Sequence, residues 1–178
     1  MDLTEKTLKS EEVYRGRIIR VMRDEVELPN GKTAVREVVR HPGAVAILAM
    51  DDDFCVQMVR QYRYAFAREL WEIPAGKREA GEEPLETAKR ELMEEVGATA
   101  ERWLPLGEMI AAPGCYDETM HLFLARGLTF GEKHPDEDEF LKVATIPFTE
   151  LKDMCLSGGI RDAKTIVAVL KAKNLMGI

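Results

Sequence analysis

The sequence predicts an α+β fold in which a mixed β-sheet lies between helices, and three observations lead to this prediction. The first 42 residues contain extended, β-rich segments joined by a strong turn signal, Pro-Asn-Gly-Lys. A single uninterrupted helix is predicted in the middle of the chain, with strand-like segments on both sides. Two further helices close the chain. The predicted segments are strands at 21–28 and 34–39 and helices at 84–96, 148–157 and about 162–174.

Between the N-terminal region and the central helix, residues 43–50 form an apolar run typical of a buried strand. An aspartate triplet at 51–53 follows; it lacks the glycine and distal glutamate of a calcium-binding loop, so we expect a turn. Residues 54–63 alternate apolar and polar side chains, which predicts the next strand. Later strands are predicted at 103–112, 120–125 and 143–146. Ile166, Val167, Val169 and Leu170 of the last helix are expected to be core.

The central helix has an apolar side and an acidic side. Pro84 suits the first turn, where no N–H donor is required, and Gly97 suits a left-handed cap at the end. Glu91 and Glu95 are one turn apart on one face, with Glu94 beside them. The residues expected to bury against the core are Leu85, Ala88, Leu92 and Val96.

The acidic side is unfavourable unless positive charge lies on it. Two carboxylates ~6 Å apart near a surface repel by roughly 2–3 kcal/mol at an effective dielectric of about 20. Arg90 relieves part of this repulsion, and we expect Glu94 and Glu82 to be its partners. A hard divalent cation, which takes oxygen ligands, relieves the rest. The alternative is a solvated acidic face, but the glycine-bounded loop at 76–81 favours a metal site.

The segment at 76–98 carries a family resemblance. Gly76, five residues, Glu82, seven residues and then Arg90-Glu91-Leu92-Met93-Glu94-Glu95-Val96-Gly97-Ala98 resembles the signature box of the Nudix hydrolases. Ala98 departs from the bulkier aliphatic residue that the family prefers, a difference in packing. The resemblance implies a Nudix-type α/β/α sandwich at 43–178, with residues 1–42 as a β-rich extension that mediates dimerisation.

Three motifs outside the box resemble the ADP-ribose pyrophosphatase branch. They are Glu72-Ile73-Pro74-Ala75-Gly76, the loop at Pro113-Gly114, and the acidic run at 136–139. This likeness implies a Mg²⁺-dependent hydrolase, with Mn²⁺ as the alternative metal and two or more ions in each site. It also implies a homodimer that exchanges its N-terminal regions.

The same likeness implies roles for residues of the box. Glu91, Glu95, Glu94 and the carbonyl of Ala75 match the metal ligands. Arg90 and Glu82 match residues that hold the loop to the helix, and Arg90, Glu94 and Glu95 belong to the catalytic set. In this branch the proton acceptor is a glutamate on a loop after the box. Glu139 matches that position best and Glu137 is the reserve; four consecutive acids are also typical of a solvated loop.

The remaining candidates bind substrate. Arg63 matches a family position that meets substrate phosphate, and the guanidinium fork suits phosphate oxygens. Glu72 and Gly76 are placed with it by the resemblance. Arg36 and Arg40 are candidates that would act in the partner's site, or they are surface charges at a strand edge. Tyr14, Tyr62 and Tyr64 could stack on adenine, although buried packing is the simpler expectation.

Composition limits the classes of function. The chain has 178 residues, which suits one domain with a sizeable core. Its net charge of -7 argues against a nucleic-acid partner. Three scattered cysteines indicate reduced thiols rather than a disulfide framework or a zinc site. The charged N-terminus and the lack of a long apolar run predict neither a signal peptide nor a membrane span, so we expect a cytoplasmic protein.

Three functional hypotheses follow. The leading one is hydrolysis of ADP-ribose to AMP and ribose 5-phosphate. The second keeps the site and changes the substrate to another nucleoside diphosphate derivative. The third is a binding module that senses a nucleotide sugar without cleaving it, and the intact set of box glutamates argues against this alternative.

Overall fold

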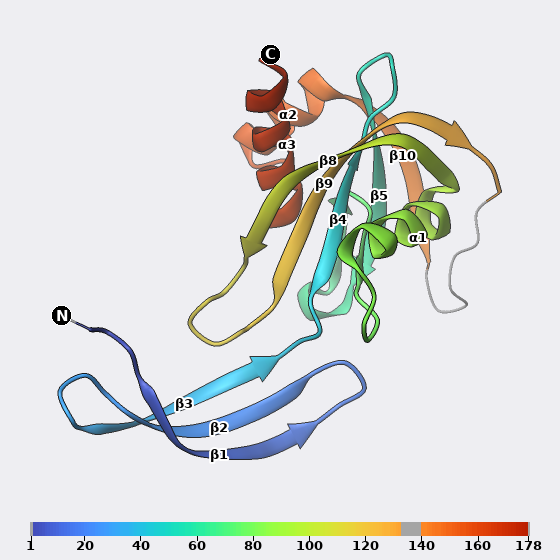
Figure 1. Cartoon of the computed structure of the whole chain (residues 1–178). Helices are drawn as coiled ribbons and strands as arrows, with labels where there is room; N and C mark the ends of the chain where they lie inside the picture. Colours follow the sequence, from blue (N-terminus) through green and yellow to red (C-terminus); the bar gives the residue numbers. More distant parts are fainter. Residues whose placement is uncertain (1, 133–139, 178) are drawn as a thin grey trace. The chain divides into compact units, whose positions relative to one another are not determined.

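The computed structural model describes residues 2–132 and 140–177. The chain divides into two compact units. The smaller unit comprises residues 1–43 and 110–119, and the larger unit comprises residues 44–109 and 120–178. Figure 1 gives the labels of the helices and strands used below.

The smaller unit is a three-stranded antiparallel sheet in the order β1-β2-β3 (Figure 1). Its strands are β1 (Lys6–Arg15), β2 (Arg20–Glu27) and β3 (Thr33–Arg40). The turn predicted between the last two strands is confirmed: the N–H of Gly31 donates to the carbonyl of Leu28 at 2.8 Å, with φ of 78° at Gly31. A β-carbon is disfavoured at that φ, so glycine fits this position.

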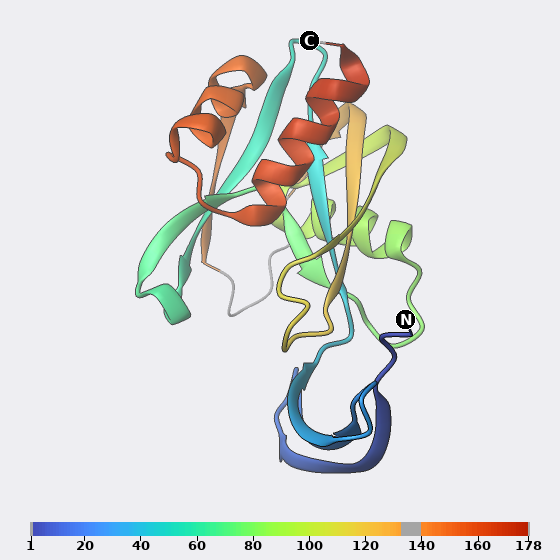
Figure 2. The same ribbon diagram turned by 90° about the vertical axis from the view of Figure 1, so that its left-hand side faces the viewer.

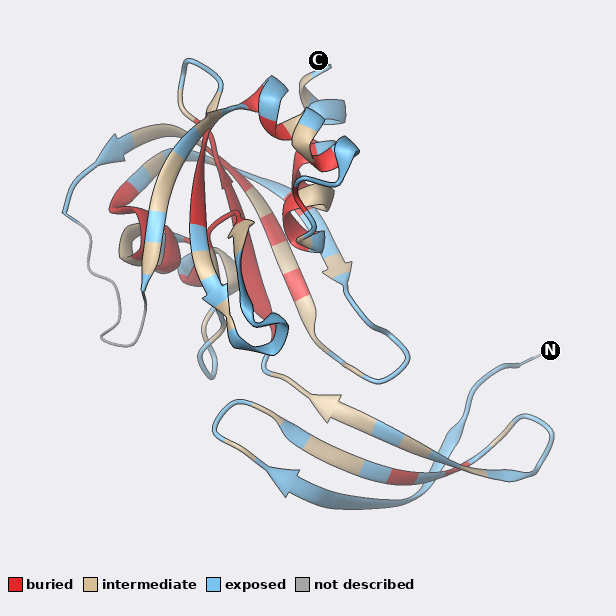
Figure 3. Cartoon of the chain, turned by 180° about the vertical axis from the view of Figure 1, so that it is seen from behind, coloured by how far each residue is buried: buried red, intermediate tan, exposed pale blue. Residues whose placement is uncertain are grey.

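The sheet of the smaller unit buries little apolar surface. Val26 is the one buried apolar side chain in its three strands. Figure 3 shows β1 exposed along its length. The loop at 110–119 is tied to β3, because Val39 donates its N–H to the carbonyl of Cys115 at 2.7 Å and accepts from Asp117 at 3.1 Å. The large apolar residues exposed in this unit are Leu3, Leu8, Val13, Tyr14, Ile18, Val35 and Ile110.

The larger unit contains two sheets. One is mixed, in the order β7-β4-β9-β8, with β4 parallel to β9 and antiparallel to β7; the other is antiparallel, in the order β10-β5-β6. Their elements are β4 (Ala44–Ala49), β5 (Cys55–Arg63), η1 (Tyr64–Phe66), β6 (Arg68–Glu72), β7 (Ala75–Lys77), α1 (Pro84–Val96), β8 (Ala98–Ile110), β9 (Thr119–Phe130), β10 (Leu141–Pro147), α2 (Phe148–Ser157) and α3 (Ala163–Met176).

Helices cover both faces of the mixed sheet. Figures 1 and 2 show α1 on one face and α2 and α3 on the other. Strand β4 lies between the layers: its even-numbered residues join the cluster under α2 and α3, and its odd-numbered residues join the cluster under α1. Every residue of β4 is therefore buried, which is why the strand reads as a continuous apolar run. The predicted α+β sandwich is confirmed.

Helix α1 begins and ends where the sequence predicts. Pro84 occupies the first helical turn, and the N–H of Gly97, at φ of 72°, reaches the carbonyls of Leu92 and Met93. Ala88, Leu92 and Val96 are buried as expected, whereas Leu85 is only half-buried.

Several expectations about other segments need correction. Strands β6 and β7 were not predicted, because one is a short charged run and the other has three residues with a central glycine. The expectation that Tyr14, Tyr62 and Tyr64 are buried is wrong, since all three are exposed. Leu170 is exposed as well.

The aspartate triplet does form a turn. The carboxylate of Asp51 accepts from the N–H groups of Asp53 at 3.0 Å and Cys55 at 2.8 Å. Within the part of the chain that the structure describes, no helix is long and apolar enough to cross a bilayer.

Candidate active site

The contact between β7 and α1 brings backbone and carboxylate together. A β-carbon placed on Gly76 would lie 1.9 Å from the carboxyl carbon of Glu91, far inside van der Waals contact. One residue earlier, the N–H of Ala75 donates to Oε2 of Glu95 at 3.1 Å. The strand therefore meets both glutamates of the same helical turn, and only glycine allows this approach at residue 76.

Glu91 and Glu95 are buried, with 6% and 3% of their surface exposed. Ionised carboxylates are rarely buried to this extent unless they are paired or bind a metal. A solvated acidic face therefore does not describe these two residues. Glu94, on the same helix, is more exposed and accepts from Nη1 of Arg90 at 2.7 Å.

Arg90 links the helix to the preceding loop. Its guanidinium donates to Glu91 at 2.8 Å, to Glu94, and to both carboxylate oxygens of Glu82 at 3.1 and 3.2 Å. The expected partners Glu82 and Glu94 are thus present. The hydrogen bonds from Arg90, helped by the N–H of Glu79, lower the pKa of Glu82 to about 2. In return, the hydrogen bond to Glu82 and the charges of Glu91 and Glu94 raise the pKa of Arg90.

A second charged group is built around Glu72 at the end of β6. Arg63 donates to its two oxygens through Nε at 2.7 Å and Nη2 at 2.6 Å, and Lys164 contacts it from the first turn of α3. Burial alone would raise the pKa of Glu72, but Arg63 and Lys164 outweigh it and the pKa is lowered. Lys164 also donates to Asp162, the N-cap of α3, at 2.9 Å.

The two groups influence one another electrostatically. The hydrogen bond to Glu72 is the main reason that the pKa of Arg63 is raised, and the charges of Glu95 and Asp162 add to the shift. The side chain of Arg63 remains 39% exposed. A guanidinium in this position can hold its own carboxylate and still present N–H groups to an anionic ligand.

The donor chemistry of the first group fits a hard divalent cation. Glu91, Glu94 and Glu95 place three carboxylates on little more than one helical turn, against the single guanidinium of Arg90 in the same helix. Oxygen donors of this kind suit Mg²⁺ or Mn²⁺. Within residues 2–132 and 140–177, however, no three acidic, histidine or cysteine side chains already converge as a metal cage. Glu94 is hydrogen-bonded to Arg90 in this arrangement.

The other predicted site residues are distributed as follows. Arg36 and Arg40 belong to the smaller unit, where Arg36 pairs with Glu5 and Arg40 pairs with Asp117. The proposed proton acceptor Glu139 and its reserve Glu137 lie outside the described residues. Gly76, Glu82, Glu72 and Arg63 all lie in the larger unit.

Sequence reasoning did not find the roles of Lys164 and Arg78. Lys164 contacts a carboxylate 92 residues away in the chain, a distance that no local pattern reports. Arg78 donates to the carbonyl of Glu82 at 2.6 and 3.2 Å and so braces the loop before α1. Asp162 was predicted only as a helix cap, a role in which its carboxylate accepts from Thr165 at 3.0 Å.

A helix that carries buried glutamates against a glycine of a mixed sheet, with helices on both faces, defines a class of protein. The chain belongs to the Nudix family: the NUDIX domain profile matches residues 39–168. The profile of the nucleoside diphosphate sugar hydrolase N-terminal domain matches residues 5–39. The enzyme class predicted from the sequence, a Nudix hydrolase, is thus confirmed.

Individual relatives narrow the comparison. The chain is 44% identical to the ADP-ribose pyrophosphatase of Bacillus subtilis (strain 168), over 94% of this chain and 91% of the relative. It is also 44% identical to the methanol dehydrogenase activator of Bacillus methanolicus, over 93% and 90%. A crystal structure of an ADP compounds hydrolase superposes with a TM-score of 0.87 at 25% identity, covering 99% of this chain and 97% of the other. The chain is therefore similar along nearly its whole length to hydrolases of ADP compounds.

Replacing Gly76 by alanine should displace Glu91, because the added β-carbon would meet its carboxyl group at 1.9 Å. We expect Gly76→Ala to lower metal-dependent turnover by about 100-fold or more. Gly131→Ala is the matched control, since the nearest atom to its β-carbon is 4.0 Å away. Steady-state kinetics on both variants, with circular dichroism to verify folding, makes the comparison. Equal activity of the two variants would contradict the assigned geometry.

The Glu82–Arg90 pair should make stability depend on pH in a defined window. Because the folded state lowers the pKa of Glu82 from 4.5 to about 2, the stabilisation is present above pH 4.5 and is lost as the pH falls toward 2. The free-energy difference between wild type and Glu82→Gln, measured by urea denaturation, should shrink over this range. Glu86→Gln, which removes a mostly exposed carboxylate of α1, corrects for net charge. A difference that is constant with pH would rule out the pair as its source.

Proposed function

We propose that this Nudix hydrolase cleaves the diphosphate bond of ADP-ribose, or of a closely related ADP-sugar, and releases AMP and ribose 5-phosphate. The observation that carries the proposal is the pair of buried glutamates, Glu91 and Glu95, held against Ala75 and Gly76. Its substrate is inferred from the ADP-ribose pyrophosphatase that is 44% identical over most of the chain.

Glu91, Glu95, Glu94 and the carbonyl of Ala75 would hold Mg²⁺, with Mn²⁺ as the alternative and two or more ions in each site. When bound, such ions neutralise the diphosphate and acidify a water molecule for attack. The chain supplies the frame for them. Arg90 keeps the glutamate-bearing turn attached to Glu82 and hence to the loop before the helix. Without that attachment the carboxylates would lose their common orientation.

Arg63 would bind a phosphate oxygen of the substrate. Its bidentate bond to Glu72 fixes the plane of the guanidinium, and Lys164 fixes Glu72 in turn. A pre-oriented guanidinium loses less rotamer entropy on binding than a free one. Gly76 would allow the substrate to approach the backbone, and Arg36 and Arg40 would act from the partner subunit.

Glu139 is our candidate for the proton acceptor, and Glu137 is the reserve. Cleavage needs a base that takes the proton of the attacking water. Both glutamates follow the box in the acidic segment at 136–139, and the assignment rests on the family resemblance. With a base outside the metal-binding helix, Glu91 and Glu95 would remain metal ligands during the reaction.

Removing the charge of Glu95 tests the proposal. We expect Glu95→Gln to lower kcat for ADP-ribose by at least about 100-fold, since an amide is a poor ligand for a hard cation. Glu86→Gln on the same helix is the control and should keep normal turnover, because Glu86 is mostly exposed. Product analysis after incubation with ADP-ribose and Mg²⁺ provides the readout. Near-normal activity of Glu95→Gln would remove the basis of the metal assignment.

The same assay separates the competing functions. A panel of ADP-sugars, dinucleotides and nucleoside triphosphates, compared by kcat/KM, should place ADP-ribose first. Preference for a triphosphate would overturn the choice of branch. Tight binding of ADP-ribose without AMP release would instead establish a nucleotide-sugar sensor.

We also propose a homodimer that exchanges its N-terminal regions, residues 1–42. Three-stranded sheets need a buried face to be stable, yet Val26 is the one buried apolar residue in β1 to β3. A second chain could cover the exposed residues of this sheet, among them Val13, Tyr14 and Val35.

We propose in addition that the protein works in a reducing compartment such as the cytoplasm, because its three cysteines, Cys55, Cys115 and Cys155, are unpaired.

Light scattering on the purified chain should give a mass of twice the 20.1 kDa of one chain at micromolar concentration. Val35→Asp, which places a charge on the exposed apolar surface of β3, should shift the mass toward one chain. Asp53→Asn in the β4–β5 turn is the control for a change of surface charge outside the smaller unit. A wild-type chain that is monomeric across this range would refute the exchanged dimer.

A further inference from the structure

A cationic cavity lies at the end of α3, on the face of the mixed sheet that this helix covers. Residues of neighbouring strands β8 and β9 alternate on this face, and Leu106, Leu122 and Leu124 are buried there in the core cluster that includes α3. Where α3 ends, the face continues into a cavity of about 280 Å³. The described residues that line it are Arg102, Leu104, Leu124, Arg126, Leu175 and Met176, which are two cations and four apolar residues with no acid among them.

The guanidinium of Arg126 has few charged or hydrogen-bonding partners for a group that is largely buried. Only 15% of its side chain is exposed. Among the described residues its Nε is buried without a hydrogen-bond partner, and Nη1 lies 3.5 Å from the sulfur of Met50. In the described part of the chain its ion-pair partner is Asp52, which is 3.8 Å away and 83% exposed. Exposed pairs at such distances contribute little, so most of the cost of desolvating the guanidinium is not offset by this contact.

The turn between β4 and β5, which contacts Arg126, contains a strained backbone conformation. Phe54 has φ of 58°, a left-handed conformation that is a true outlier for a bulky residue. Such strain concentrates at functional sites. Here it places the ring of Phe54 4.9 Å from the guanidinium of Arg126, a cation–π arrangement. The carbonyl of Phe54 is held by the N–H of Phe148 at 2.9 Å, which locks the turn onto α2.

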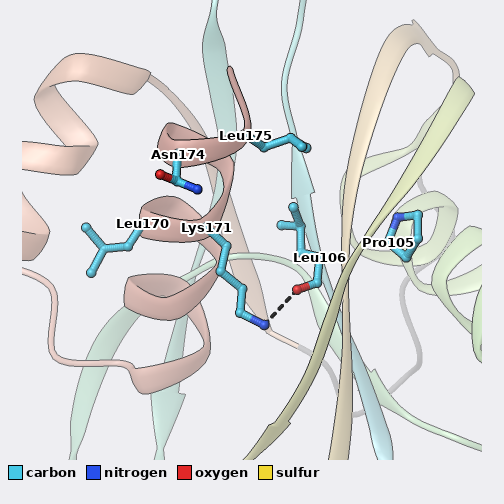
Figure 4. A pocket seen from close by; sticks show the side chains of 6 residues that line it. All are labelled: Pro105, Leu106, Leu170, Lys171, Asn174 and Leu175. Carbon is cyan, nitrogen blue, oxygen red and sulfur yellow. Dashed lines mark hydrogen bonds between the residues drawn. The ribbon is translucent and has the colours of Figure 1, made fainter. Parts of the chain in front are cut away.

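A second cavity shares Leu175 with the first. It measures about 440 Å³ and lies between α3 and β8 (Figure 4). Its lining residues are Pro105, Leu106, Leu170, Lys171, Asn174 and Leu175. Lys171 spans it and donates to the carbonyl of Leu106 at 2.7 Å. The apolar side chains here, together with Leu104, provide room for the hydrocarbon part of a ligand whose charged end meets the arginines.

We propose that the cavity formed by Arg102 and Arg126 binds a small oxyanion, a carboxylate or a phosphate monoester, that carries a short apolar tail. A guanidinium suits either anion because its N–H groups match two oxygens. The site is separate from the catalytic glutamates. Gly76 pairs with Val45 near the start of β4, whereas Met50 lies five residues further along, roughly 16 Å at about 3.3 Å per residue.

Calorimetric titration of the full chain with hexanoate, hexyl phosphate and hexanol tests the proposal. At least one of the two anions should bind at least tenfold more tightly than hexanol, which has the same tail without the charge. Should hexanol bind as tightly as both anions, or should neither anion bind at millimolar concentration, the proposal is overturned. The preferred anion identifies the source of the ligand: hexanoate stands for a free acid and hexyl phosphate for a phosphate monoester.

Variants locate the binding site. Arg102→Gln, at an exposed position, should weaken anion binding about tenfold while the fold is preserved. Leu175→Trp should abolish binding, because Leu175 lines both cavities and the larger ring would occupy space in them. Arg126→Lys keeps the charge and loses the guanidinium fork, so it should weaken binding without removing the cation. Lys173→Gln removes a positive charge that lines neither cavity and should leave the affinity unchanged. Unaltered affinity in Arg102→Gln and Arg126→Lys would place the ligand elsewhere.

Discussion

The absence of a side chain at Gly76 is the constraint on which the rest of the site depends. Any β-carbon there would occupy the space of the Glu91 carboxyl group, so β7 could not lie against α1. That packing also brings the N–H of Ala75 to Glu95. One missing methyl group therefore sets the positions of two buried carboxylates. It also aligns a backbone segment with the helix, and backbone atoms do not change rotamer. The precision of the site comes from a strand and a helix rather than from mobile side chains.

The packing of β7 against α1 also determines how charges are distributed in the larger unit. Two carboxylates buried on one helical turn repel each other, and Arg90 can neutralise only part of the excess because it also serves Glu82 and Glu94. The carboxylate donors suit a hard cation, and a bound cation would draw an anionic substrate to a protein of net charge -7. Around Glu72 the charges balance, since Arg63 and Lys164 face the two carboxylates of Glu72 and Asp162. In the proposed function, metal held by the glutamates of α1 and the guanidinium of Arg63 would both bind the diphosphate.

Local features of the chain were the most accessible to sequence reasoning. Pro84 and Gly97 delimit α1 through rules that act within one turn, so its bounds were predictable. Alternation along residues 54–63 gave β5 for the same reason. Contacts between distant segments were not accessible: Lys164 reaches Glu72 across 92 residues, and nothing near either residue in the sequence reports the pairing. The exposure of Tyr62 and Tyr64 was missed because a tyrosine fits both a core and a surface. Whether it is buried depends on whether another element packs over it.

Strand β4 explains why a second site could arise without disturbing the first. Its residues are buried on both faces, so the strand is held rigidly between two helical layers. Gly76 pairs near its start, and the strained turn with Phe54 follows its end. Strain at Phe54 is confined by the hydrogen bonds of Asp51 and Phe148 and by the ring contact with Arg126. An anion that paired with Arg126 would stabilise that turn at the end of β4, while the glutamates near the start of β4 kept their positions. Binding of an anion in the cationic cavity should accordingly raise the stability of the fold more than it changes catalysis.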